Sequence, residues 1–159
     1  MATTLVEFQN IPKFGFAHHV YTENICQVQK DIQHSFVLVY VKSGHLTARI
    51  YDRCIEAPAG SVLILFRHVP FQLYSPRHTP QDYCSIQAYT DYCFELLEDG
   101  EDFPPDFSGL ALPLVVPPGN EAELIKKDML SIISALSVSR ELNSFSAAMT
   151  MCGMLSRLD

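Results

Sequence analysis

Residues 36–89 read FVLVYVKSGHLTARIYDRCIEAPAGSVLILFRHVPFQLYSPRHTPQDYCSIQAY, and this stretch decides the fold. It consists of short apolar or alternating runs that Gly and Pro interrupt at regular spacing, as at Ser43-Gly44 and Pro58-Ala59-Gly60. Runs rich in β-branched and aromatic residues between such frequent breakers are typical of antiparallel strands and are too short for helices. The runs span residues 36–41, 46–51, 61–66, 71–74 and 83–89. The stretch therefore predicts a β-barrel or β-sandwich core.

The bulk composition indicates one globular domain that does not itself bind nucleic acid. The chain has 159 residues, of which 48% are hydrophobic, and this is enough for one sizeable core. The formal net charge is −7, and only 11 Lys and Arg residues are scattered along the chain. A nucleic-acid surface needs clustered cations to pair with phosphates, so we expect none on this chain.

Cysteine usage and the N-terminus predict a cytoplasmic protein. The five Cys residues are odd in number and form no Cys-x-x-Cys pair, which favours reduced thiols over a disulfide framework. The N-terminus lacks the charged and apolar regions of a signal peptide, and no apolar stretch approaches the roughly 20 residues of a spanning helix. We therefore expect no membrane partner.

Changes of pattern along the chain predict four segments. We expect an arm over residues 1–13, the barrel over residues 14–100, a Pro-rich connector over residues 101–119 and two helices over residues 120–159. The connector contains five Pro residues, which favour extended backbone.

Three shorter stretches carry further expectations. Residues 92–97 fit a short helix or turn that closes the barrel, and residues 110–116 could add an edge strand. The chain ends at Asp159 within a helical pattern that has no stop signal. This ending predicts that the chain is cut from a longer protein.

The predicted helices are each one-sided. In the first helix the apolar residues recur in steps of three and four and form one stripe; they are Leu124, Ile125, Met129, Ile132, Ile133 and Leu136. The second helix is expected to begin at Ser144, with Phe145, Ala148, Met149, Cys152 and Leu155 on one face. Such stripes commonly pack on the domain's own core. They could also form a self-complementary dimer interface, and we predict that the first stripe does so.

Alternation in two strands predicts a binding cavity. Tyr83, Ser85 and Gln87 share one face of their strand, and Arg49 lies on the semi-polar face of residues 46–51. If these faces point inward, their polar groups would orient a ligand inside a mostly apolar barrel. Periodicity alone does not choose between the inner and outer faces.

The order of these motifs resembles the AraC/XylS family of transcription regulators in its N-terminal cupin-like domain. The resemblance rests on residues 37–44, 57–65, 68–75 and 82–89, and on the helix pair at residues 120–158. It implies a mainly β domain with C-terminal helices (α+β), in which a cupin-like antiparallel barrel of the double-stranded β-helix type precedes a helical hairpin. It also implies that the chain forms a homodimer and binds a small-molecule effector. DNA would be bound only by a C-terminal domain outside this chain.

The same resemblance places the ligand-binding residues. The motifs align Tyr74, Ser85 and Gln87 with pocket positions, and Lys42 lies near a basic pocket position. Sugar-sensing members often carry His and Trp where this chain has Ser85 and Gln87, which argues against a carbohydrate effector because a Trp face for stacking is missing. The full predicted set is Tyr74, Ser85, Gln87, Arg49, Tyr40 and Lys42.

Metal binding and catalysis have no supporting motif. The six His residues form no His-x-His pair, and Leu63 stands three residues after Gly60, where a metal-binding cupin supplies a His. No Gly-x-Ser-x-Gly motif occurs, no Cys or Ser has an evident His partner, and paired carboxylates occur only in the acidic loop of residues 98–102. We therefore expect no metal, no cofactor, no catalytic residue and no enzyme activity.

These observations favour an effector-sensing and dimerisation domain of an AraC-type regulator, in which a ligand shifts the arrangement of the arm or the dimer. Two alternatives stay open. A stand-alone cupin enzyme, such as an isomerase or dioxygenase, would hold a metal. A protein-docking module without a small-molecule ligand would have a solidly packed barrel interior.

Overall fold

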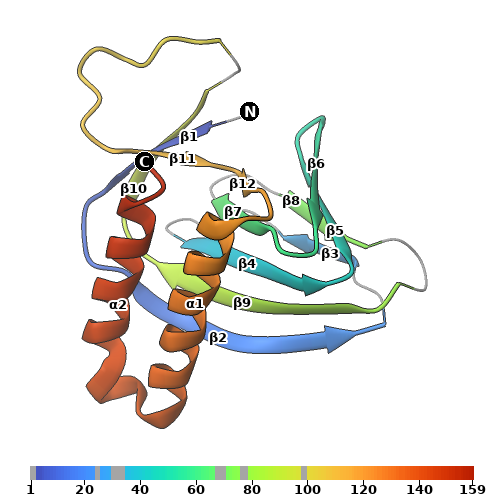
Figure 1. Ribbon diagram of the computed structural model, residues 1–159. Coiled ribbons are helices and arrows are strands. Elements are labelled where there is room, and N and C mark those ends of the chain that lie inside the picture. Colours follow the sequence, from blue (N-terminus) through green and yellow to red (C-terminus); the bar gives the residue numbers. More distant parts are fainter. Residues whose placement is uncertain (1–2, 24–25, 30–34, 67–70, 76–78, 98–99) are drawn as a thin grey trace.

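A computed structural model describes residues 3–23, 26–29, 35–66, 71–75, 79–97 and 100–159 (Figure 1). Most of the chain forms β-strands, and two α-helices follow at the C-terminal end. The strands are β1 (Thr3–Phe8), β2 (Lys13–Thr22), β3 (Cys26–Gln29), β4 (Ser35–Ser43), β5 (His45–Ile50), β6 (Arg53–Pro58), β7 (Val62–Phe66), β8 (Phe71–Tyr74), β9 (Gln81–Tyr89), β10 (Tyr92–Leu97), β11 (Leu110–Pro113) and β12 (Val115–Val116). The helices are α1 (Asn120–Val138) and α2 (Arg140–Ser156).

Strands β2 to β9 pair in a nested antiparallel order. β2 pairs with β9, β3 with β8, β4 with β7 and β5 with β6. The pairs lie in two sheets, a five-stranded sheet of order β12-β7-β4-β9-β2 and a four-stranded sheet of order β3-β8-β5-β6. This nesting is the double-stranded β-helix, or jelly roll. The predicted fold class, a cupin-like β-barrel with C-terminal helices, is confirmed.

Glycines with positive φ make two of the reversals that the sequence predicts. Gly44 has a φ of 91° between β4 and β5, and Gly60 has a φ of 90° between β6 and β7. Glycine adopts this backbone conformation without a steric penalty. Both turns therefore lie where local sequence places them.

A third sheet joins the two ends of the described chain. It has the order β10-β1-β11, so β1 lies between two strands that come roughly 85 to 110 residues later. Leu5 and Val6 of β1 are buried, although the sequence predicts an arm there. The expectation of a short helix or turn over residues 92–97 is wrong, because these residues form β10 and pair with β1. The predicted edge strand at residues 110–116 is confirmed as β11 and β12.

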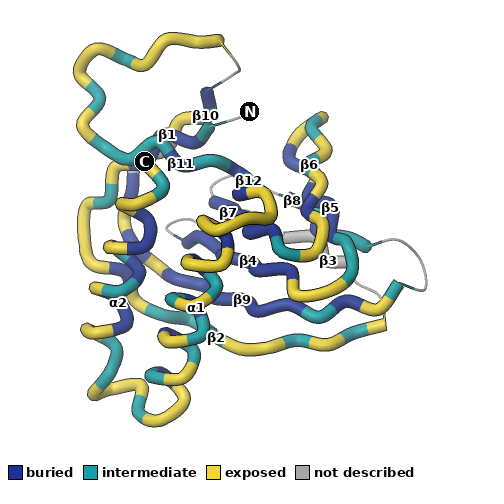
Figure 2. Tube along the Cα trace, viewed as in Figure 1, coloured by how far each residue is buried: buried dark blue, intermediate teal, exposed yellow. Residues whose placement is uncertain are grey.

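The central strands β4 and β9 of the five-stranded sheet are buried on both faces. Leu38 on β4 and Ile86 on β9 belong to a core cluster shared with the helices, whereas Val37 and Val39 belong to a second cluster between the two sheets. Figure 2 shows β4 and β9 as almost continuously buried. Burial on both faces explains why the run at residues 36–41 is continuously apolar and does not alternate.

The helices pack against each other and against the outer face of the five-stranded sheet (Figure 1). Helix α2 begins at Arg140 and not at Ser144, because the Ser139 side chain accepts a hydrogen bond from the Leu142 amide and caps the helix. None of the described helices is long and apolar enough to cross a membrane.

Candidate functional site

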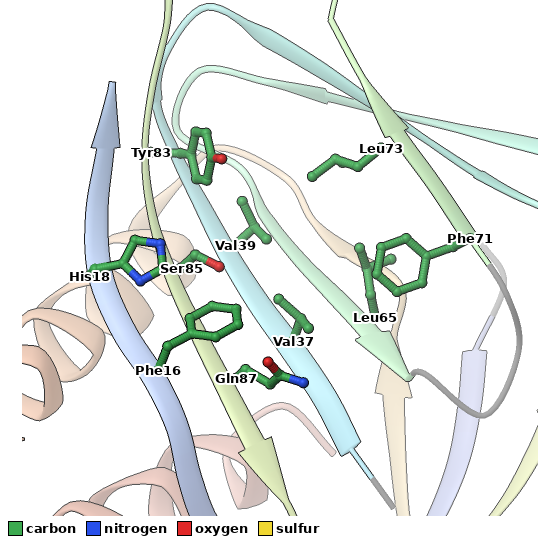
Figure 3. Close-up of a pocket in the computed structure, with 10 residues that line it drawn as sticks. All are labelled: Phe16, His18, Val37, Val39, Leu65, Phe71, Leu73, Tyr83, Ser85 and Gln87. Carbon is green, nitrogen blue, oxygen red and sulfur yellow. The ribbon is translucent and has the colours of Figure 1, made fainter. Parts of the chain in front are cut away.

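A cavity of about 270 Å³ lies between the two sheets of the jelly roll. Figure 3 shows side chains of β2, β4 and β9 facing those of β8 across it. The lining residues are Phe16, His18, Val37, Val39, Leu65, Phe71, Leu73, Tyr83, Ser85 and Gln87. Six of these side chains are hydrocarbon, and the other four, His18, Tyr83, Ser85 and Gln87, carry polar groups. Apolar walls with placed polar groups are usual for small-molecule sites.

Strand β9 supplies most of the polar groups. Tyr83, Ser85 and Gln87 alternate along the strand and line the cavity, whereas Cys84 and Ile86 belong to the helix-side core. The structure therefore places two of the six predicted ligand-binding residues, Ser85 and Gln87, in one cavity. Their face is inward because the opposite face of β9 packs under the helices.

Gln87 is the most informative residue of the cavity. Its side chain is 4% exposed, and its Nε2 atom has no hydrogen-bond partner among the described residues. Figure 3 shows the amide directed into the space between the sheets. A buried donor without a partner costs about 1–3 kcal/mol, so a bound molecule that accepts this hydrogen bond would recover that free energy.

The other polar side chains of β9 are also withdrawn from water. Ser85 and Tyr83 are each 5% exposed. Burial raises the pKa of the Tyr83 phenol above its ordinary value, because the phenolate would lose its hydration. Tyr83 therefore presents a neutral hydroxyl at neutral pH.

Two residues that sequence reasoning missed lie at the open side of the cavity. Phe16 and His18 come from β2, which is the edge strand of the five-stranded sheet. Their ring centroids are 4.8 Å apart, and His18 is exposed whereas Phe16 is half-buried. Alternation in residues 14–18 puts Phe16 and His18 on one face of the strand, but only the pairing of β2 with β9 places that face at the cavity.

Tyr40 and Lys42 do not line the cavity. The Tyr40 hydroxyl donates to Glu123 Oε1 on α1 over 3.0 Å, on the helix side of β4. Lys42 is exposed, and its Nζ atom lies 3.0 Å from Asp82 Oδ2 in an ion pair. Both residues were predicted to bind ligand, but the cavity receives Val37 and Val39 of the same strand instead.

Arg49 and Tyr74 do not line the cavity either. Arg49 is exposed because Ala48 and Ile50 are the residues of β5 that turn inward. Tyr74 lies across from Thr47 on β5, and its hydroxyl is 3.9 Å from the Cys54 sulfur. These side chains belong to the outer surface of the four-stranded sheet and therefore lie outside this cavity.

Most of the predicted dimer stripe of α1 is core. Ile125, Met129, Ile132 and Leu136 are buried against the same chain, and Ile133 packs against that core. Leu124 is 56% exposed. The four buried side chains are unavailable to a partner subunit because they already contact the five-stranded sheet and α2.

The exposed apolar residues lie on α2 instead. Leu142 is 85% exposed, Phe145 63% and Met149 45%, and their spacing of three and four residues puts them on one face. We call these three residues the α2 stripe. Sequence reasoning expected Phe145 and Met149 on an apolar face but missed Leu142, because it began the helix at Ser144.

One cysteine–histidine pair was also missed. Cys84 Sγ lies 3.6 Å from His19 Nε2, because the two residues are cross-strand neighbours on β9 and β2. Burial raises the pKa of the Cys84 thiol, so the reactive thiolate is disfavoured at neutral pH. Within the described residues no group of three or more His, Cys, Asp and Glu could hold a metal ion.

Comparisons with known proteins found no matching family but did find solved structures with a similar fold. No protein-family profile matches the chain, and no curated protein matches it. The chain is similar to the cupin domain of Schizosaccharomyces pombe Cnp3, with 14% identity over 52% of this chain and 68% of that chain, at a TM-score of 0.41. It is also similar to Escherichia coli YhaK, with 14% identity over 69% of this chain and 43% of that chain, at a TM-score of 0.45.

The nested strand pairing and the cavity together define the class of this protein. It is a cupin-like double-stranded β-helix domain that has a small pocket between its sheets and carries two C-terminal helices. The class rests on the strand order of this chain and not on these similarities.

Proposed function

We propose that this chain binds a small-molecule effector between its two sheets and transmits binding to its helices, as the sensing and dimerisation part of an AraC-type transcription regulator. The observation that carries the proposal is the buried side chain of Gln87, which lines the cavity and whose Nε2 donor has no partner among the described residues. A binding role fits better than catalysis, because no carboxylate or thiol is among the described residues that line the cavity.

The five-stranded sheet provides the physical route from the pocket to the helices. Val39 lines the cavity, whereas the adjacent Leu38 and Tyr40 contact the helix side. A ligand that shifts β4 or β9 would change the packing of α1, provided that it binds one arrangement more tightly than another. DNA would be contacted by a domain outside this chain, whose position the helices would bias.

We assign dimerisation to the α2 stripe in place of the α1 stripe. A two-fold interface needs the same apolar patch on both copies, and Leu142, Phe145 and Met149 provide an exposed patch of this kind. The double variant Leu142→Glu/Phe145→Glu is expected to sediment as a folded monomer. Tyr21→Glu, at a site 71% exposed on β2, is the control that should leave the mass unchanged.

A dimer that survives the α2 double variant would overturn this interface. The substitutions Ile125→Glu and Met129→Glu on α1 would not test a dimer interface. Both side chains are buried in the chain's own core, so the introduced charges would unfold the domain.

The pocket itself is tested by filling it. A library of small neutral fragments should perturb the NMR signals of the Val37, Val39 and Leu65 methyl groups, and Val39→Phe should abolish the effect by occupying the cavity. Val138→Phe is the matched control, because residue 138 is 81% exposed. Unperturbed methyl signals, or binding that Val39→Phe leaves intact, would contradict a small-molecule site and favour a protein-docking module.

A further inference from the structure

The lining of the pocket carries information about the charge of its ligand. None of the ten described lining residues is Lys, Arg, Asp or Glu, and the titratable ones are His18, at the exposed edge, and Tyr83. The nearby ion pair of Lys42 and Asp82 joins β4 to β9 on the surface, so neither charge is offered to the cavity. A charged ligand would lose its hydration without gaining a counter-ion from the described lining residues.

The polar groups of the pocket come from four of its ten lining residues and include a donor. Gln87 Nε2 needs an acceptor, and Ser85 is the other small polar side chain buried beside it on β9. A polyol such as a sugar would bring several hydroxyl groups against the side chains of Val37, Val39 and Leu65, where they would find no partners. Unpaired buried hydroxyls are costly, so this apolar wall disfavours a polyol that would contact it.

The size of the pocket limits the apolar body of the ligand. The cavity measures about 270 Å³, which is at or below the lower end of ordinary ligand sites, roughly 300–1,000 Å³. Phe71 and Leu73 of β8 close it opposite β9 (Figure 3). One ring or a short branched chain fits this space, whereas a polycyclic molecule or a long acyl chain does not.

We propose that the pocket binds compact neutral molecules with an apolar body and a carbonyl-type acceptor that takes the hydrogen bond from Gln87. This inference rests on the proposed function and names the ligand class of the same site. Phe16, half-buried at the open edge, would cover the outer side of a bound ring by edge or face contact.

Three probes of similar shape separate the contributions to binding. Acetophenone is neutral with one acceptor, ethylbenzene has no acceptor, and benzoate is charged. Titrations followed at the Val37, Val39 and Leu65 methyl groups should show acetophenone binding and benzoate binding at least about tenfold more weakly, because the lining offers no counter-charge.

The Gln87→Leu variant removes the proposed donor and so measures the contribution of its hydrogen bond to the ligand. It should weaken the binding of acetophenone about two- to tenfold, the usual effect of one hydrogen bond, and should not weaken the binding of ethylbenzene. Gln72→Leu, on strand β8 of the facing sheet and outside the pocket lining, is the control that should change neither affinity. Gln87→Met serves as a second variant of closer shape if Gln87→Leu lowers the melting temperature.

The outcomes distinguish this inference from the proposed function. Benzoate binding more tightly than acetophenone, or acetophenone affinity that is unchanged in both Gln87 variants, would overturn the ligand class while the pocket remains a binding site. If no probe moves the methyl signals and fragments also fail, both the ligand class and small-molecule sensing are overturned.

Discussion

The hydroxyl of Tyr40 donates a 3.0 Å hydrogen bond to Glu123, and this contact ties the central strand β4 to the first turn of α1. Lys126 completes the cluster, since its Nζ atom lies 3.1 Å from Glu123 Oε2 and 5.2 Å from the centroid of the Tyr40 ring. The residue predicted to bind ligand thus connects the sheet to the helix on the side opposite the pocket.

This cluster predicts an acid-dependent contribution to stability. Hydrogen bonds from Lys126 and, second, from Tyr40 lower the pKa of Glu123. A lowered folded-state pKa stabilises the fold above the unfolded-state value of about 4.3, and the contribution is lost as the pH falls through the folded-state pKa. Tyr40→Phe should therefore lower the urea midpoint more at pH 7 than at about pH 3. An equal loss at both pH values would contradict this role.

Two members of the predicted α1 stripe should lose very different amounts of stability when they are truncated. Met129 is fully buried, so Met129→Ala should lower the free energy of unfolding by about 2–5 kcal/mol. Leu124 is 56% exposed, and Leu124→Ala should change it by less than about 0.5 kcal/mol. Chemical denaturation measures both, and similar losses would mean that the helix face is assigned wrongly.

The β4–β5 turn should not tolerate a side chain at residue 44. Gly44 has a φ of 91°, and a Cβ atom there would lie 2.4 Å from Gln81 Oε1 and 2.6 Å from the Pro80 carbonyl oxygen. Gln81 Oε1 also accepts a hydrogen bond from the His45 amide, over 2.8 Å. Gly44→Ala should therefore destabilise the fold by at least about 1–3 kcal/mol in thermal or urea unfolding.

Gly153 in α2 is the matched control for that substitution. A Cβ atom there meets nothing within 4 Å, and alanine is the better helix former by about 0.8–1.0 kcal/mol. Gly153→Ala should raise the unfolding midpoint. If both alanine variants shifted stability in the same direction, turn geometry would not be the cause.

Tyr83 predicts a loss of stability at alkaline pH. Burial raises the pKa of its phenol, so the neutral phenol stabilises the fold below the unfolded-state value of about 10, and this contribution is lost as the pH rises through the folded-state pKa. Tyr83→Phe, which cannot ionise, should unfold at a higher pH than the unsubstituted chain in an ultraviolet absorbance titration. An unchanged alkaline midpoint would rule out a buried phenol at this position.

Local sequence determined the elements whose signals are short-range. The turns at Gly44 and Gly60 follow from the backbone freedom of glycine, and the edge strands at residues 110–116 follow from extended Pro-rich sequence. The alternation of residues 83–89 also correctly grouped Ser85 with Gln87. Periodicity of this kind reports which residues share a face.

Only the tertiary structure decided which face is inside. Residues 92–97 became a strand because β1, about ninety residues away, provides the pairing partner, and Phe16 and His18 reach the pocket because β2 pairs with β9. Tyr40 and Arg49 turned away from the pocket because the neighbours on their strands face the interior of the jelly roll. A repeat of two or 3.6 residues groups side chains, but the surface that each group covers depends on contacts between segments distant in sequence.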